Sequence, residues 1–553
     1  MTVGAAVRRR RVGEPAPAPV AWWQPAVALL VLVGVVARVW MLWHAPLNAD
    51  EANAGLMARQ ILHGHFYTFF WGGQYGGIEP YAMAPFVLVF GNNPIALNAV
   101  PAVLAGVSCL LVWRVGLLVF WNRAVAALAG AVAWVWPENN MWLSTRESGF
   151  RQATFVCGLL VLLLAARVAY RSRPGSRRDW LLLGLAAGAG WWSSPEIVYY
   201  LAPAGVLLVL RHGRELRDRD PDVWRRVARA AVGGVIGALP WLYTNIQDGF
   251  LSLTEPTSHT SYGTRLHVFA AKVAPMLLGL RAEGAGQWIL RPPIARGLDA
   301  VAVELLIAAA IAAFWWQPRA RFLVAGIVAF PFLYAAFPPN GFWNDGRYGA
   351  PLAPMIVLVL VGGGALLLSG LARLAPYAAT GLELAAGLAA AATVAATFNL
   401  SQAHALGSWS ALTTFGPDPN RGTRQVIVDL DALHVRDAYA TYWISYDVMF
   451  LSAGRITMTE IDDIRWRGAY DAVNASPDPA WVYVNPQAEK AATVQFGVSD
   501  LGFPESQIVH YLQAHAIAYQ YHRVGLVDVI QPARKVTPSD IGARPVFVWN
   551  PAQ

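Results

Sequence analysis

The sequence predicts a polytopic α-helical membrane protein with a small C-terminal α/β domain outside the membrane. Hydrophobic residues make up 56% of the 553 residues and charged residues only 14%, whereas an ordinary globular chain carries about 25% charged residues. Apolar runs recur up to about residue 400, and the mean hydropathy of the whole chain is +0.39. From residue 401 onward, shorter amphipathic and β-rich segments replace these runs. Such a composition excludes a disordered, a collagenous or a purely cytosolic protein.

Eleven apolar runs are candidates for membrane-spanning helices, each of which needs roughly 20 mostly apolar residues. The stretch 180–210 leaves two interpretations open, because Trp191-Trp192-Ser193-Ser194-Pro195 is either a turn between two short spans or a kink in one long span. A single span would export the arginine-rich segment 211–229, so we expect two. The eleven runs then cover residues 25–43, 94–118, 124–136, 152–170, 180–192, 195–210, 227–243, 299–316, 321–336, 351–370 and 376–399.

Arginine placement predicts the orientation, because short loops rich in Lys and Arg stay in the cytoplasm. Residues 1–24 form a basic tail with Arg8 to Arg11, which we expect in the cytoplasm. The arginine-rich segments expected on the same side are 171–178, 211–229 and 319–321. Residues 25–400 are then a transmembrane domain with outer loops 44–93 and 244–298, and residues 401–553 lie outside. The sequence thus predicts a multi-pass protein of the plasma membrane.

The first apolar run has a rival interpretation as a signal peptide with a cleavage site at Ala52-Asn53-Ala54. Its apolar stretch is longer than the usual 7 to 15 residues or so of a signal peptide. We therefore expect an uncleaved anchor. Cleavage after Ala54 would remove the acidic pair at positions 50 and 51.

The basic charge of the chain is explained by the membrane rather than by nucleic acid. The net charge is 42 − 34 = +8, yet only three of the basic residues are lysines, and most arginines lie in short segments between apolar runs. Such arginines act as topological signals, so we expect no nucleic-acid partner. Cys109 and Cys157 both lie inside apolar runs, which leaves no cysteine for a disulfide outside the membrane.

Residues 401–553 are expected to form a small α/β domain. The amphipathic and β-rich segments that predict it are 424–434, 438–443, 480–485, 506–515 and 517–530. Four aromatic residues near its start have two open roles, stacking on sugar faces or packing in the domain core. They are Tyr439, Tyr442, Trp443 and Tyr446.

Charged residues are scarce, so the carboxylate pair Asp50-Glu51 just beyond the first apolar run is informative. Residues 51–63 fit a short amphipathic helix at the outer interface, with Leu56, Met57 and Ile61 toward the bilayer. Asp50 is then either the N-cap of this helix or a general base at the membrane surface. Glu51 either orients an acceptor or a neighbouring amide, or is a solvated residue of the first turn.

An Asp-Glu pair in a first outer loop, followed by an amphipathic helix, resembles the GT-C superfamily of polyprenyl-phosphate-sugar-dependent glycosyltransferases. The resemblance is to glycosyltransferase family 39 in particular, with its protein O-mannosyltransferase and aminoarabinose-transferase relatives. Further similar features are Glu79-Pro80-Tyr81, Arg146-Glu147, Trp191-Trp192-Ser193-Ser194-Pro195 and Arg347-Tyr348. The likeness covers the architecture of residues 25–400. Many family members carry an Asp near Gln152, and this chain has none there.

The resemblance implies an inverting enzyme that moves a sugar from a polyprenyl-phosphate donor to a hydroxyl of a cell-envelope glycan, glycolipid or protein on the extracytoplasmic face. A monophosphate leaving group carries less charge than a diphosphate, so arginines suffice to stabilise it. We therefore expect no metal and no cofactor. The implied roles are catalytic for Asp50 and Glu51, donor phosphate-binding for Arg347, Arg146 and Tyr348, and substrate-binding for Glu79, Tyr81 and Glu147.

Some of the remaining polar residues have simpler explanations. Arg38 lies inside the first run, where snorkelling to the interface is favoured over phosphate binding. Arg347 also fits a pairing with Asp345 or with a lipid phosphate. The histidines near Asp50 match no standard metal-ligand spacing; they are His44, His63 and His65.

The alternative function is a transporter or flippase of lipid-linked sugars. Transporters place essential charges near the bilayer midplane, between repeated halves. Here the best candidate charges lie in predicted outer loops and the sequence shows no repeat. These features favour the enzyme.

Overall fold

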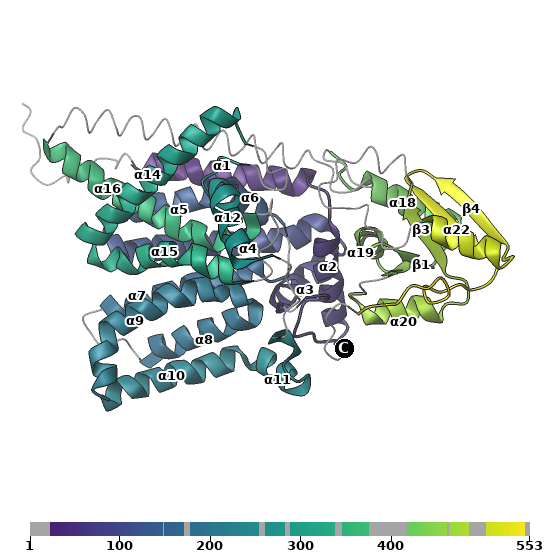
Figure 1. The fold of residues 1–553 in the computed structure, drawn as a ribbon, viewed down its shortest axis with the longest axis horizontal. Coiled ribbons are helices and arrows are strands. Elements are labelled where there is room, and N and C mark those ends of the chain that lie inside the picture. The colour runs from purple at the N-terminus through teal and green to yellow at the C-terminus, as the bar shows by residue number, and fades with distance from the viewer. Residues whose placement is uncertain are drawn as a thin grey trace, which may run out of the picture.

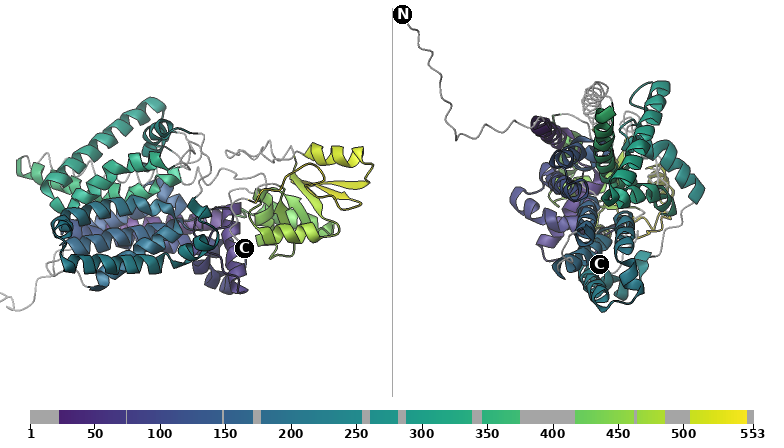
Figure 2. Two further views of the ribbon diagram at one scale, coloured as in Figure 1. Left: turned by 60° about the horizontal axis from the view of Figure 1, so that its bottom comes forward. Right: turned by 90° about the vertical axis from the view of Figure 1, so that its left-hand side faces the viewer.

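The computed structural model describes residues 23–73, 75–146, 149–170, 177–253, 260–281, 288–337, 346–374, 417–461, 464–485 and 505–547. A bundle of long helices forms the larger part, and a smaller part with a β-sheet lies beyond one end of it (Figure 1). Helices α2 (Ala49–Leu62) and α3 (Ile78–Phe90) lie between the two (Figure 2).

The predicted apolar runs form the helices of the bundle. These are α1 (Trp23–His44), α4 (Pro94–Phe120), α5 (Arg123–Val135), α7 (Arg151–Tyr170), α8 (Arg177–Ser193), α9 (Val198–Arg217), α10 (Pro221–Gly237), α11 (Leu239–Gln247), α14 (Pro292–Trp316), α15 (Arg321–Ala336) and α16 (Ala353–Leu374). The predicted run 376–399 lies outside the described residues, as does the predicted domain boundary at residue 400.

Within the described ranges, six helices are long and apolar enough to cross a membrane, and a seventh span results if α10 and α11, bent by 63°, count as one. The polytopic helical membrane class is therefore confirmed, and the number of eleven spans stays a prediction. The stretch 180–210 breaks into α8 and α9, because Ser194 caps the short 3₁₀ turn Pro195–Ile197 between them. Helix α14 begins at Pro292, a few residues before the predicted run.

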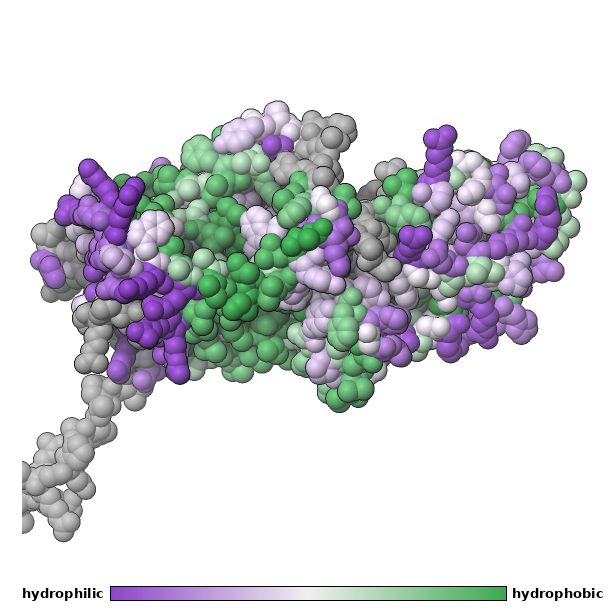
Figure 3. All heavy atoms as spheres, turned by 90° about the horizontal axis from the view of Figure 1, so that it is seen from below, coloured by the Kyte–Doolittle hydropathy of each residue, from purple (hydrophilic) through white to green (hydrophobic). Residues whose placement is uncertain are grey.

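The surface of the bundle has the polarity of a membrane protein. On the face seen in Figure 3, a broad hydrophobic area covers its middle, and hydrophilic residues gather at the end remote from the sheet. At this end the Tyr170 hydroxyl donates to the carbonyl of Arg319 at 3.2 Å, and Arg211 donates to the carbonyl of Ala169 at 3.2 Å. Arginine-rich helix ends therefore share one end of the bundle, as loops on one side of a membrane would. That this side is the cytoplasm stays a prediction.

Helices α8 and α10 pack through two facing pairs of glycines spaced four residues apart. These are Gly184 and Gly188 on α8, and Gly233 and Gly237 on α10. A Cβ atom at Gly184 would lie 1.8 Å from the carbonyl oxygen of Ala230, and one at Gly188 would lie 2.0 Å from that of Gly234. Small residues at this spacing let two membrane helices approach to backbone contact.

The C-terminal part contains a five-stranded sheet in the order β2-β1-β3-β5-β4. Strands β1, β2 and β3 are parallel, whereas β5 runs antiparallel to both β3 and β4. The elements in chain order are α18 (Arg421–Ala432), β1 (Asp437–Ala440), α19 (Tyr442–Leu451), β2 (Thr457–Glu460), α20 (Arg467–Ala475), β3 (Ala480–Val484), α22 (Glu505–Ala514), β4 (Tyr519–Val524) and β5 (Val527–Pro532). Tyr439 and Tyr446 are fully buried here, which favours core packing over sugar stacking for both.

Helix α2 is buried between the bundle and the sheet rather than lying on the bilayer. Leu56 and Met57 are 4% and 0% exposed, and they belong to the same hydrophobic cluster as Phe450 on α19. A Cβ atom at Gly55 would lie 2.5 Å from the Phe450 ring, so a glycine is required for this approach. The prediction that Leu56 and Met57 face the bilayer is therefore wrong, because α19 covers this face of α2.

Candidate active site

Asp50 lies in the first turn of α2, but it does not cap the helix. The N-cap is Asn48, whose side chain accepts a hydrogen bond from the backbone of Glu51 at 3.0 Å. The N-cap interpretation of Asp50 is therefore wrong. Its carboxylate instead accepts a hydrogen bond of 2.5 Å, at Oδ1, from the hydroxyl of Tyr442 at the start of α19. Burial, and then the charge of Asp50, raise the pKa of Tyr442, which keeps this hydroxyl protonated as a donor.

The sheet places a second group beside Asp50. Tyr442 follows β1, and Arg465 follows β2, so both lie beyond the carboxyl ends of adjacent parallel strands, where open α/β sheets bind ligands. The guanidinium carbon of Arg465 lies 3.9 Å from the centre of the Tyr442 ring. Burial disfavours the charge of Arg465, but the neighbouring Tyr442 and Asp50 outweigh it and raise the pKa of Arg465. The result is a carboxylate, a hydroxyl and a cation in one cluster.

Glu51 points away from Asp50 into a buried ion pair. Its carboxylate lies 2.8 Å from Nη1 of Arg146 and accepts a hydrogen bond of 3.0 Å from Asn98. It also accepts from the backbone N–H of Asn48, which completes a capping box. Glu51 is 0% and Arg146 4% exposed, so Glu51 is not a solvated first-turn residue. Both side chains fix the chain that carries Asp50, since Arg146 also donates to the carbonyl of Pro46.

Asp447 is a buried acid of this region that the sequence did not reveal. It lies on α19 and is 2% exposed, and its Oδ1 has no hydrogen-bond partner among the described residues. Burial first, and then the charges of Glu51 and Asp50, raise the pKa of Asp447 well above its ordinary value. Both effects favour the protonated form of this acid.

A second polar cluster surrounds Arg347 and Tyr348. Arg151, in the first turn of α7, forms an ion pair with Glu196 at 2.9 Å and donates to the carbonyl of Arg347 at 3.0 Å. Its guanidinium carbon lies 5.2 Å from the centre of the Tyr348 ring. The structure therefore groups two of the three predicted phosphate-binding residues with Arg151, which sequence reasoning missed. Arg146, the third, is paired with Glu51 instead.

The predicted substrate-binding residues Glu79 and Tyr81 hold neighbouring backbone. Glu79 is 1% exposed, and its carboxylate accepts from the backbone N–H of Ala153 at 2.7 Å, which caps the start of α7. The Tyr81 hydroxyl donates to the carbonyl of Tyr67 at 2.9 Å and accepts from the N–H of the same residue at 3.0 Å. Glu147 lies outside the described residues.

Arg38 does not snorkel to the interface. It is 4% exposed, donates from Nε to the Ser144 hydroxyl at 2.9 Å, and lies 3.4 Å over the Trp134 ring. The snorkelling prediction is therefore wrong, because a hydroxyl and an aromatic face inside the bundle satisfy the guanidinium. In the part of the chain that the structure describes, no group of three or more His, Cys, Asp or Glu side chains is placed to hold a metal ion.

Comparison with known proteins agrees with this architecture. Residues 78–243 match the model of a family described as dolichyl-phosphate-mannose-protein mannosyltransferase. The chain is also similar to the crystal structure of ArnT from Cupriavidus metallidurans bound to undecaprenyl phosphate, with a TM-score of 0.56, 12% identity, and coverage of 92% of this chain and 98% of that one. The apo state of the same ArnT gives a TM-score of 0.55 with the same identity and coverage. The comparison with curated protein sequences found no match.

A more distant likeness, to the apo Archaeoglobus fulgidus oligosaccharyltransferase, has a TM-score of 0.46 with 11% identity over 84% of this chain and 69% of that one, which is too low to define a shared fold. At 12% identity, the likeness to ArnT shows the fold. The resemblance to the GT-C superfamily glycosyltransferases is therefore confirmed, in fold along most of the chain and in sequence over residues 78–243.

Proposed function

We propose that the protein is an inverting membrane glycosyltransferase. It would take a sugar from a polyprenyl-phosphate donor and pass it to a hydroxyl of a cell-envelope glycan, glycolipid or protein on the extracytoplasmic face. The observation that carries this proposal is the environment of Asp50. Because Asn48 caps the helix, the Asp50 carboxylate is free of that role, and it accepts a hydrogen bond from Tyr442, whose ring lies under Arg465. The ArnT structure with undecaprenyl phosphate supports a lipid-linked donor.

In the proposed reaction, Asp50 accepts the proton of the acceptor hydroxyl as that oxygen forms a bond to the anomeric carbon of the sugar. The bond from this carbon to the phosphate oxygen breaks on the opposite face, which inverts the configuration and releases polyprenyl phosphate. Arg347 and Tyr348, with Arg151 behind them, are proposed to stabilise the phosphate that leaves. Glu51 is proposed to position Asp50 through Asn48 and Arg146 rather than to take a proton.

Topology supports the proposed side of the membrane. Helix α2, which carries Asp50, lies at one end of the bundle (Figure 1), and Arg211 and Arg319 lie at the other. If those arginines are cytoplasmic, Asp50 and the sheet lie outside the cell.

The experiment incubates the purified protein in lipid nanodiscs with a panel of synthetic polyprenyl-phosphate sugars and measures release of polyprenyl phosphate. An Asp50→Ala variant runs beside it. We expect release with at least one donor, loss of release in the variant, and opposite anomeric configurations in donor and product by NMR. Transport of a lipid-linked sugar across proteoliposomes without release of polyprenyl phosphate would instead establish the flippase.

A further inference from the structure

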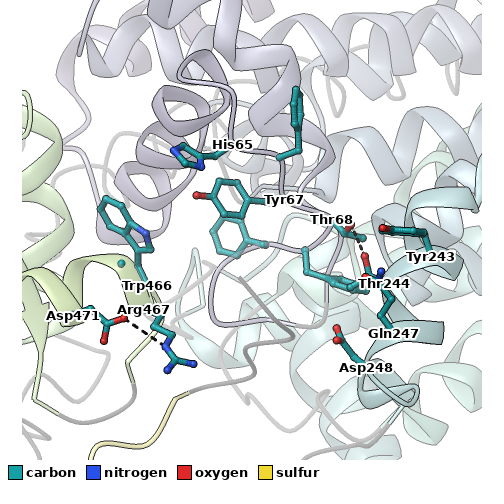
Figure 4. A pocket seen from close by; sticks show the side chains of 14 residues that line it. His65, Tyr67, Thr68, Tyr243, Thr244, Gln247, Asp248, Trp466, Arg467 and Asp471 are labelled. Atoms are coloured by element: carbon teal, nitrogen blue, oxygen red, sulfur yellow. Dashed lines mark hydrogen bonds and ion pairs between the residues drawn. The ribbon is translucent and has the colours of Figure 1, made fainter.

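A cavity of about 430 Å³ lies where three segments far apart in the sequence meet (Figure 4). One wall is the loop after α2, which includes Tyr67. A second wall is the end of α11, with Tyr243, Gln247 and Asp248. The third wall is the start of α20, formed by Arg467, its first residue, and by Trp466, which precedes it. Its volume lies within the range of roughly 300 to 1,000 Å³ that is usual for small-ligand sites.

The lining of this cavity combines aromatic faces with polar groups that bind hydroxyls. Trp466 and Arg467 lie across the cavity from Gln247 and Asp248, and Tyr67 lies between them (Figure 4). Carboxylate and amide oxygens accept hydrogen bonds from hydroxyls, and flat aromatic rings pack against apolar C–H faces. A saccharide carries both kinds of surface, because each sugar ring has C–H faces and a rim of hydroxyls.

The charges of the lining disfavour an anion. Arg467 pairs with Asp471 at 3.6 Å, both of them lining residues, so Asp248 is the carboxylate in excess. Among the described residues, Oδ2 of Asp248 has no hydrogen-bond partner. A carboxylate in excess in the lining fits a neutral, hydroxyl-rich ligand, and it does not fit the phosphate of a donor lipid.

A short stretch of chain connects the cavity to the candidate active site. Trp466, in the cavity wall, stacks on Trp71 with ring centres 4.5 Å apart. The preceding residue, Arg465, covers the ring of Tyr442, whose hydroxyl binds Asp50. The aliphatic part of Arg465 packs against Gly72, where an added Cβ atom would lie 2.5 Å from Cγ of Arg465. Asp50 itself does not line the cavity. The cavity wall is therefore one residue along the chain from the guanidinium that covers Tyr442.

We propose that this cavity binds the non-reacting sugar units of an uncharged saccharide acceptor. The inference rests on the proposed function and selects the glycan or glycolipid head group over a protein side chain as the acceptor. Binding energy from such a remote part of the substrate orients the reacting hydroxyl toward Asp50.

Saccharide binding is tested directly, without catalysis, by saturation-transfer difference NMR on the wild-type protein in nanodiscs with maltotriose, cellotriose and mannotriose as probes. The test variant is Tyr243→Ala/Asp248→Asn. It removes one exposed ring and one carboxylate charge from the cavity, and Tyr243 is 66% exposed, so its loss leaves the core intact. The matched control is Tyr262→Ala/Asp222→Asn, two residues outside the cavity lining.

We expect at least one trisaccharide to bind the wild type and the control equally, and to bind the test variant about tenfold more weakly or worse. In transfer assays the test variant should raise the KM for the acceptor and also lower kcat, because less binding energy is left to orient the reacting hydroxyl, while the donor KM stays unchanged. No transfer of saturation to any of the three sugars, or equal binding by the test variant, overturns the inference.

The two proposals fail separately. Asp50→Asn should leave saccharide binding unchanged while transfer is lost. If trisaccharides bind in the cavity but no polyprenyl-phosphate sugar is consumed, the proposed function fails and the saccharide site stands. If transfer occurs but no saccharide binds, only the cavity assignment fails.

Discussion

The hydroxyl of Tyr442 lies 2.5 Å from Oδ1 of Asp50, although 392 positions separate the two residues in the sequence. One belongs to the first turn of α2, and the other begins α19 in the sheet-bearing part. Arg465 covers the ring of this tyrosine. The candidate base is therefore held by a part of the chain that contributes no helix to the membrane bundle.

Replacing Asp50 with Asn should remove proton transfer while keeping the shape of the side chain. General-base catalysis contributes about 10² to 10⁴-fold, or on the order of 3 to 5 kcal/mol in the barrier. We expect a fall in kcat of that size and an unchanged thermal unfolding midpoint in nanodiscs. Sugar transfer at the wild-type rate by the folded variant would defeat the assignment.

Tyr442→Phe should lower kcat by about 10 to 100-fold, because a hydrogen bond to a charged group contributes roughly 1.5 to 3 kcal/mol. The donor KM should change little, since the ring stays in place under Arg465. Tyr439→Phe is the control, as its buried hydroxyl bonds Asn474 at 3.0 Å. Equal effects of the two substitutions on kcat would mean that Tyr442 acts through folding alone.

Glu51→Gln should destabilise the protein by about 3 to 5 kcal/mol, because it leaves the Arg146 guanidinium buried without its carboxylate. The double variant Glu51→Gln/Arg146→Met should be more stable than the single one. Asp222→Asn is the control, because Asp222 and Arg225 form an exposed pair worth about 0 to 1 kcal/mol. Thermal unfolding in nanodiscs measures the stability of the three variants. An unfolding midpoint of Glu51→Gln equal to that of the wild type would show that the ion pair contributes nothing to stability.

Gly188→Val should separate α8 from α10, since even a Cβ atom at Gly188 would lie 2.0 Å from the carbonyl of Gly234. Overpacking of this kind costs about 1 to 3 kcal/mol or more, which a lower unfolding midpoint would report. Gly205→Val on α9 is the control, because nothing lies within 4 Å of a Cβ atom there. Similar losses at both positions would indicate a general effect of helix glycines.

Glu460 at the end of β2 should make stability depend on pH. Burial raises the pKa of Glu460 from 4.5 to about 7, against the opposing effects of backbone hydrogen bonds and Arg465. As the pH rises from about 4.5 to about 7, the unfolded chain releases this proton first, so the stability present at lower pH is lost. Glu460→Gln should flatten the decline of the unfolding midpoint over this range. Identical pH profiles of variant and wild type would contradict it.

The helices of the bundle follow from the sequence, because a long apolar run has few alternatives in a membrane. The break at Pro195 was also predictable, since Ser194 supplies a local cap. The same logic failed for Arg38 and Met57. The sequence pattern predicts that both are interfacial, but both are buried by distant segments of the chain. Arg38 is covered by the segment around Ser144, and Met57 by the segment around Phe450.

The partners of Asp50 were the least predictable part of the site. The sequence marks Tyr442 only as one of several aromatic residues, and Arg465 and Asp447 belong to no motif. Their roles depend on the register of β1 and β2 and on how the sheet packs against α2. Such contacts between distant segments are set by tertiary packing, which propensity and spacing do not report.

The distance along the chain between Asp50 and Tyr442 also has a consequence in time. A ribosome adds roughly 5 to 20 residues per second, so the 392 residues between them take about 20 to 80 seconds to synthesise. Until the chain has been synthesised and folded beyond residue 442, the newly inserted helices hold a carboxylate without its tyrosine. A ribosome that stalls after the bundle would leave Asp50 in the bilayer without the hydroxyl that binds it.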